Sequence, residues 1–198
     1  MHRVRDILQV LMLALFLGSS VFAQDEAKPP TAGLPEDFAE KDKLQRSKSA
    51  PHEEMKKRVG KWKVTTKFAA MFGGQSELGE CTMRLILDGK FMVSEGTATY
   101  MGQKCSTYGV YGYDSLASEY TFYNLNSIYT LANEMRGKMR DDGIIEYKGI
   151  MKDAMTVDGR PYRAEEKGVN DDRFEIKVFD SAGDKEIEVF TMIYERIK

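Results

Sequence analysis

The chain has 198 residues and a formal net charge of −2, with basic and acidic side chains interspersed along its length. No stretch concentrates Lys and Arg, so composition gives no electrostatic support for nucleic-acid binding. The only histidines are His2 and His52. Because zinc sites need several His or Cys ligands, we expect no metal and no cofactor.

The first 23 residues have the pattern of a secretory signal peptide. Arg3 and Arg5 precede the apolar run ILQVLMLALFLG, and Val21 and Ala23 occupy the small-residue positions of a cleavage site. The apolar run is shorter than the roughly 20 residues that a membrane-spanning helix needs. We therefore expect cleavage near Ala23–Gln24, a secreted, periplasmic or extracellular protein, and no stable membrane span afterwards.

Residues 24–49 are rich in proline and charge, which is typical of a mobile linker, although a short helix within residues 35–46 is compatible with the sequence. A brief helix is expected over residues 50–59. Ser49 can cap it, Pro51 suits its first turn, and Gly60 ends it. This helix would act as a plug or lid for the part of the chain that follows.

From residue 61 to the end, the apolar period changes to two, as in half-buried strands. In KWKVTTKF, for example, Trp62, Val64 and Phe68 alternate with lysines. The ten expected strands cover residues 61–68, 81–87, 91–100, 105–113, 119–125, 127–139, 143–151, 161–169, 173–179 and 186–197. Short Gly-, Asp- and Asn-rich links, including a turn over GGQSELGE at residues 73–80, leave no room for crossover helices. The sequence therefore predicts an all-β fold, an antiparallel up-and-down barrel over residues 50–198.

Several motifs resemble known families. GKW at the start of the first strand and YERIK at the end of the last are similar to the calycin pattern, which implies that Arg196 packs over Trp62 and closes the barrel. HEEMKKRVGKW, LDGKFMVSEGTATYMGQ, GVYGYD and FTMIYERIK resemble the bacterial family called domain of unknown function 1579, over roughly residues 52–198. That family has Trp-x-Asp where this chain has Asn124, Leu125 and Asn126.

The sequence lacks the usual catalytic sets. There is no G-x-S-x-G motif, and the expected barrel contains no histidine to activate a serine or cysteine. Cys81 and Cys105 fall on strands that flank a third strand, and second-neighbour strands lie about 9–10 Å apart. A disulfide needs Cα atoms within about 7 Å, so two free buried thiols are favoured, with a bridge across a distorted edge as the alternative.

Aromatic and amide side chains on the faces assigned inward could line a ligand cavity or simply fill the barrel core. The candidate lining residues are Phe68, Glu95, Tyr111, Tyr120, Phe122, Asn124, Asn133 and Tyr147. The register around Glu95 is ambiguous, because Met92 and Ala98 offer a rival inner face, and a solvated Glu95 is the favoured alternative.

We therefore expect a non-enzymatic protein that binds a small apolar or amphipathic ligand inside the barrel. One alternative is a filled barrel that acts as a structural or interaction protein of the cell envelope. Another is a weak lyase, isomerase or hydrolase that uses Glu95 with tyrosine hydroxyls.

Overall fold

A computed structural model describes residues 34–153, 156–182 and 185–198. The predicted signal peptide and its cleavage site lie outside the described residues. None of the helices within these ranges is long and apolar enough to cross a membrane.

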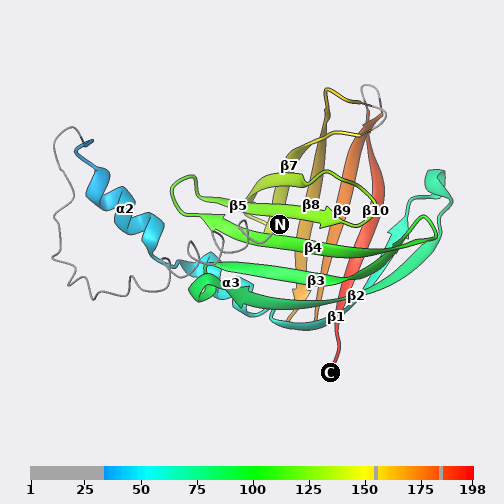
Figure 1. The fold of residues 1–198 in the computed structure, drawn as a ribbon, viewed down its shortest axis with the longest axis horizontal. Coiled ribbons are helices and arrows are strands. Elements are labelled where there is room, and N and C mark those ends of the chain that lie inside the picture. The colour runs from blue at the N-terminus through cyan, green and yellow to red at the C-terminus, as the bar shows by residue number, and fades with distance from the viewer. Residues whose placement is uncertain (1–33, 154–155, 183–184) are drawn as a thin grey trace, which may run out of the picture. The chain divides into compact units, whose positions relative to one another are not determined.

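The fold is a closed antiparallel barrel of ten strands, as the sequence predicts (Figure 1). The strands are β1 (Gly60–Phe68), β2 (Ser76–Ile86), β3 (Phe91–Tyr100), β4 (Gln103–Asp114), β5 (Glu119–Asn126), β6 (Asn133–Met139), β7 (Ile144–Met151), β8 (Arg160–Asn170), β9 (Arg173–Ala182) and β10 (Lys185–Arg196). Each strand pairs with its neighbour in sequence, and β1 pairs with β10 to close the ring. Closure leaves no unpaired sheet edge.

Two helices precede the barrel, α2 (Phe38–Arg46) and α3 (Ala50–Lys56). The residues that follow α3 continue as hydrogen-bonded turns up to Val59, so the helix is shorter than the predicted 50–59. Its cap involves His52, whose Nδ1 accepts a hydrogen bond from the Ser49 N–H at 3.0 Å. His52 and Met55 are buried, and α3 contacts β2, β3 and β4.

Helix α3 lies at one end of the barrel, which we call the helix end. The β2–β3, β4–β5, β6–β7 and β8–β9 connections share this end, because every strand reverses direction relative to its neighbour. His52 lies edge-on to Tyr113 near the end of β4, with ring centroids 6.0 Å apart. The opposite end, which we call the mouth, carries the β1–β2, β3–β4, β5–β6 and β7–β8 connections.

Two predicted boundaries are wrong. The turn expected over residues 73–80 is confined to its start, because Gly73 and Gly74 have positive φ and β2 already begins at Ser76. The strand expected over residues 127–139 begins only at Asn133. Its first part is a turn, in which Asn126 Oδ1 accepts hydrogen bonds from the N–H groups of Ile128 and Tyr129.

The two cysteines are free and buried, in agreement with the sequence-based argument. Cys81 on β2 pairs with Gly96 of β3, and Cys105 on β4 pairs with Ala98 of the same strand. Strand β3 therefore separates the two thiols.

Candidate functional site

The barrel interior is the candidate site, and the strand register decides which side chains line it. Trp62 pairs with Cys81, Met83 with Ser94, and Met92 with Tyr111, so these residues share one face. The core cluster shows that this face is the inner one. The same register continues around the ring and places seven of the predicted lining residues inward: Phe68, Tyr111, Tyr120, Phe122, Asn124, Asn133 and Tyr147.

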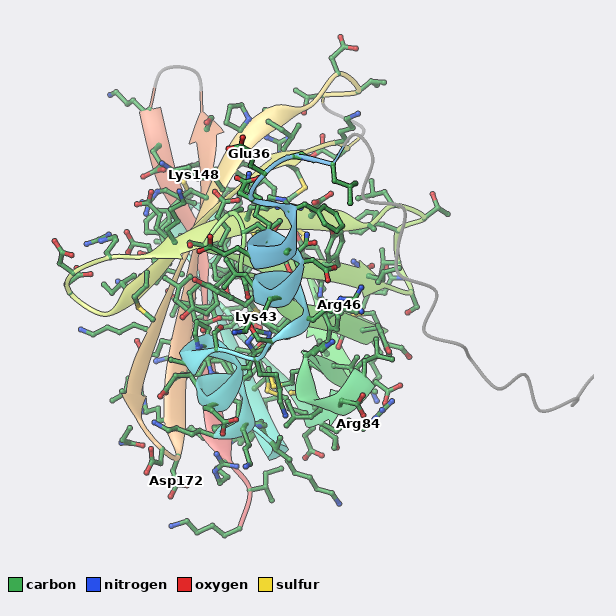
Figure 2. The ribbon with its side chains drawn as sticks, turned by 90° about the vertical axis from the view of Figure 1, so that its left-hand side faces the viewer. Glu36, Lys43, Arg46, Arg84, Lys148 and Asp172 are labelled. Atoms are coloured by element: carbon green, nitrogen blue, oxygen red, sulfur yellow. The ribbon has the colours of Figure 1, made fainter. Side chains whose placement is uncertain are left out.

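Glu95 is the exception: its place among the candidate lining residues is wrong, and the favoured alternative, a solvated Glu95, agrees with the structure. It pairs with Thr82 and Tyr108 on the outer face, because Met92, Ser94 and Gly96 occupy the inward positions of β3. Its carboxylate pairs with Arg84 at 3.2 Å, and about half of each side chain is exposed. Arg84 lies at the periphery of the molecule in Figure 2. The carboxylate chemistry suggested for Glu95 inside the barrel therefore has no structural basis.

The helix end is closed by Arg196 and Trp62. The Arg196 guanidinium lies 4.2 Å from the centre of the Trp62 ring and donates hydrogen bonds to the carbonyl oxygens of Val59 and Lys57. Asp172, labelled in Figure 2, pairs with Arg196 Nε at 3.1 Å. Trp62 Nε1 donates to the Arg58 carbonyl at 2.8 Å, so the chain after α3 is fixed across this end of the barrel.

An ion pair that the sequence analysis missed occupies the interior near the helix end. Arg58 reaches inward from the segment after α3, pairs with Glu166 of β8, and lies 4.6 Å from the centre of the Phe174 ring. The Glu166 side chain is 1% exposed and that of Arg58 is 22% exposed. Burial works against the charged form of Arg58, but Glu166 keeps the arginine pKa above its ordinary value.

Tyrosines surround this pair. Burial raises the pKa of Tyr111 and Tyr147 well above the ordinary value, and the negative charge of Glu166 adds to the shift at both. Tyr194, whose pKa burial also raises, stacks on Phe174 with ring centroids 4.2 Å apart. The interior near the helix end is thus packed with side chains, and we call it the filled half.

The interior near the mouth differs, and we call it the mouth half. Its inward residues include Phe68, Tyr100, Thr107, Asn124, Asn133, Met151, Arg160, Tyr162, Val178, Asp180 and Phe190. Most of these side chains remain partly exposed, although they point into the barrel. The inner wall is therefore more exposed at this end than around Trp62 and Met83 of the filled half, which are each 1% exposed.

Aromatic rings form the apolar part of the mouth half. Phe68 lies 5.7 Å from Tyr100 and 5.9 Å from Phe190 between ring centroids. Together these rings give the mouth half an aromatic lining, which small-molecule sites commonly have.

Two polar atoms of the mouth half are buried without a hydrogen-bond partner among the described residues, Asn133 Oδ1 and the Tyr162 hydroxyl. Burial raises the pKa of Tyr162. Leaving a polar group buried and unpaired costs about 1–3 kcal/mol, so each such atom calls for a reason. Asn133 is one of the lining residues predicted from the sequence, whereas Tyr162 is not among them.

The described residues contain no cluster of His, Cys, Asp or Glu side chains suited to a metal ion. Of this pair, only the inward position of Glu166 could have been predicted from the sequence, because Glu166 alternates with Tyr162 and Ala164 on one face of its strand. Nothing in the sequence marks Arg58, which belongs to the turn after α3.

Comparison with known proteins identifies the family. The model of the family described as "Protein of unknown function (DUF1579)" matches residues 47–196. The chain belongs to the DUF1579 family. This match covers α3 and all ten strands of the DUF1579 barrel.

A solved structure of a redesigned beta barrel is similar to this DUF1579 chain over 73% of its length and 95% of the other chain, with 12% identity and a TM-score of 0.38. We draw no functional argument from a likeness of this size. The search of curated proteins found no match.

Proposed function

We propose that this DUF1579 protein binds one small amphipathic ligand in the mouth half of its barrel. The observation that carries the proposal is the contrast between the two halves of one interior. Inward side chains such as Thr107, Asn124 and Val178 stay partly exposed at the mouth, whereas Trp62, Met83 and Tyr111 of the filled half are buried. A barrel that served only as a solid scaffold would gain stability by burying these positions too.

The lining supports an amphipathic ligand over a purely apolar one. Phe68, Tyr100 and Phe190 supply apolar surface, while Asn124 and Asn133 supply amide groups on neighbouring strands. Apolar walls with a few polar groups that fix orientation are the usual composition of such sites. The role we propose is that of a non-enzymatic carrier or sensor, since Glu95 lies outside and the buried Glu166 is engaged by Arg58.

Secretion is part of the same proposal and rests on the sequence of residues 1–23, with its two arginines, short apolar run and small-residue cleavage site. A carrier outside the cytoplasm would meet its ligand there. N-terminal sequencing of the protein purified from its own host tests this point. A mature N-terminus at or near Gln24 is expected, and an intact Met1 in the cell-associated fraction would contradict it.

A fluorescence titration with the neutral probe N-phenylnaphthylamine tests binding. The full chain is expected to bind the probe and enhance its emission. Val178→Trp fills the mouth half from β9 and is expected to weaken probe binding about tenfold or more. Lys177→Trp is the matched control, because Lys177 neighbours Val178 on the same strand and points outward.

The control variant is expected to bind the probe as the unmodified chain does, and circular dichroism establishes that both variants are folded. Absence of probe binding to the unmodified chain would refute the proposal. Equal binding by the Val178→Trp variant would move the site out of the mouth half.

A further inference from the structure

The two unpartnered polar atoms of the mouth half point to the chemistry of the ligand. Tyr162 is 7% exposed, and its hydroxyl has no hydrogen-bond partner among the described residues. The Asn133 Oδ1 atom is likewise buried and unpaired. A side chain that retains a buried, unsatisfied polar group suggests a partner supplied from outside the chain.

A glycine lies under the Tyr162 ring, on the strand between the two that carry Tyr162 and Asn133. Gly149 on β7 lies between Met135 of β6 and Tyr162 of β8 in the strand register. A Cβ atom on Gly149 would lie 2.7 Å from Tyr162 Cε1 and 2.5 Å from the Glu134 carbonyl oxygen. The Tyr162 ring therefore lies over Gly149 of β7, the strand between β8 and β6, and β6 also carries Asn133.

The donor and acceptor types of the two groups restrict the ligand. Asn133 Oδ1 can only accept a hydrogen bond, and the Tyr162 hydroxyl can donate or accept one. A ligand hydroxyl can donate to the first and accept from the second, so a single neutral group can satisfy both. A carboxylate has no proton for Asn133 Oδ1. An ammonium group can donate to both oxygens, but it has no lone pair to accept the Tyr162 hydroxyl proton, which only the ligand hydroxyl pairs.

The charges at this end also disfavour a carboxylate. Arg160, the inward-facing arginine near Tyr162, donates to both carboxylate oxygens of Asp180 at 2.7–3.1 Å and to Asp153 Oδ2 at 2.7 Å. Its guanidinium is therefore already neutralised by two acids. An anionic head group buried beside these acids would not find Arg160 free to pair with it.

Resting on the binding function proposed above, we infer that the ligand is a neutral amphiphile that carries a hydroxyl group, held by Asn133 and Tyr162, with its apolar part against Phe68, Tyr100 and Phe190. The ligand hydroxyl would make the hydrogen bonds that hold the ligand in place, and the aromatic rings would contact its apolar part. Asn124, a further polar residue of the wall, pairs with Asn133 across the β5–β6 register.

Competition between the bound probe and three compounds of equal chain length tests this inference. Decanol is expected to displace N-phenylnaphthylamine at a concentration about tenfold lower than decanoate or decylamine. Tyr162→Phe removes one hydroxyl without changing the ring, and it is expected to weaken decanol binding about fivefold while probe binding stays within about twofold. Tyr194→Phe is the matched control, because its hydroxyl contacts Met192 Sδ at 3.7 Å in the filled half, and it is expected to leave decanol binding unchanged.

Each outcome separates this inference from the proposed function. If the probe binds but decanoate or decylamine competes as well as decanol, or if Tyr162→Phe binds decanol as tightly as the unmodified chain, the hydroxyl anchor is refuted and the binding function stands. If no probe binds, the proposed function itself fails.

Discussion

The Arg58–Glu166 pair allows the most direct test of how the filled half is held together. Replacing Arg58 by Met keeps a long straight side chain but removes the charge that faces Glu166. The Glu166 carboxylate, 1% exposed, would then be buried without a counter-ion. Breaking a buried ion pair in this way typically costs about 3–5 kcal/mol, and we expect a loss of that size in the free energy of unfolding.

The opposite single variant is expected to cost less. Glu166→Leu leaves Arg58 unpaired, but the arginine side chain is 22% exposed and lies beside the barrel end, so its head group can turn toward water. A loss of about 1–3 kcal/mol is expected. The double variant removes both charges and substitutes apolar groups of similar size, and such a replacement is often neutral or stabilising. We therefore expect its free energy of unfolding to differ from that of the unmodified chain by less than about 1 kcal/mol.

Urea unfolding of the four proteins, followed by the fluorescence of Trp62, measures this cycle. Trp62 is the only tryptophan, is 1% exposed, and lies in the same half of the barrel as the ion pair. Urea is preferable to guanidinium chloride because its neutral molecules do not screen charges. A loss below about 1 kcal/mol for Arg58→Met, or losses that simply add in the double variant, would refute the view that the pair is energetically coupled in the interior.

Three further predictions follow from individual contacts. Gly149→Ala would place a Cβ atom 2.5 Å from a backbone oxygen and should lower unfolding stability by about 1–3 kcal/mol in urea. Gly168→Ala, with no atom within 4 Å of its Cβ position, should change the free energy of unfolding by less than about 1 kcal/mol. Similar losses for the two glycine variants would contradict the register of β6–β8. Burial raises the pKa of Tyr147, so the stability that it contributes is complete below about pH 10 and is lost as the pH rises further, by up to about 1.4 kcal/mol per pH unit. Above about pH 10, the free energy of unfolding should fall less steeply with pH for Tyr147→Phe than for the unmodified chain. Equal slopes for the two proteins would contradict this prediction. Because Cys81 and Cys105 are free and burial raises the pKa of both thiols, a thiol reagent should titrate two groups in the unfolded chain and react slowly with the folded one, whereas titration of none after unfolding would reveal a disulfide.

The sequence predicted the barrel because its information is local and periodic. The alternation in KWKVTTKF places Trp62, Val64 and Phe68 inward, and the structure buries all three while the lysines between them are exposed. Short turn-forming links then force antiparallel neighbours, and ten such strands close on themselves. The inward aromatic residues could be assigned for the same reason.

The errors arose where the periodic signal was ambiguous or where side chains replaced backbone pairing. In FMVSEGTATY both faces carry apolar residues, and the structure buries Met92 inward and Val93 outward, each at 1% exposure or less. Alternation alone could not place Glu95 on either face. The false strand start before Asn133 had a different cause, because Asn126 forms a local turn that apolar counting does not detect.

Long-range polar contacts were beyond the sequence altogether. Arg58 and Glu166 are far apart in the chain and meet only because the barrel closes around them. The unpaired state of Tyr162 and Asn133 likewise depends on where neighbouring strands place their side chains, which no pattern along one strand encodes.

Native mass spectrometry of the protein purified from its own host tests the central claim most directly, namely that the mouth half holds a small ligand. We predict a non-covalent additional mass that is lost on unfolding, belongs to a neutral hydroxyl-bearing amphiphile, and is absent from the Val178→Trp variant prepared in the same way. A bare chain mass that also shows no complex when decanol is added would contradict the claim and identify the DUF1579 barrel as one without a small ligand.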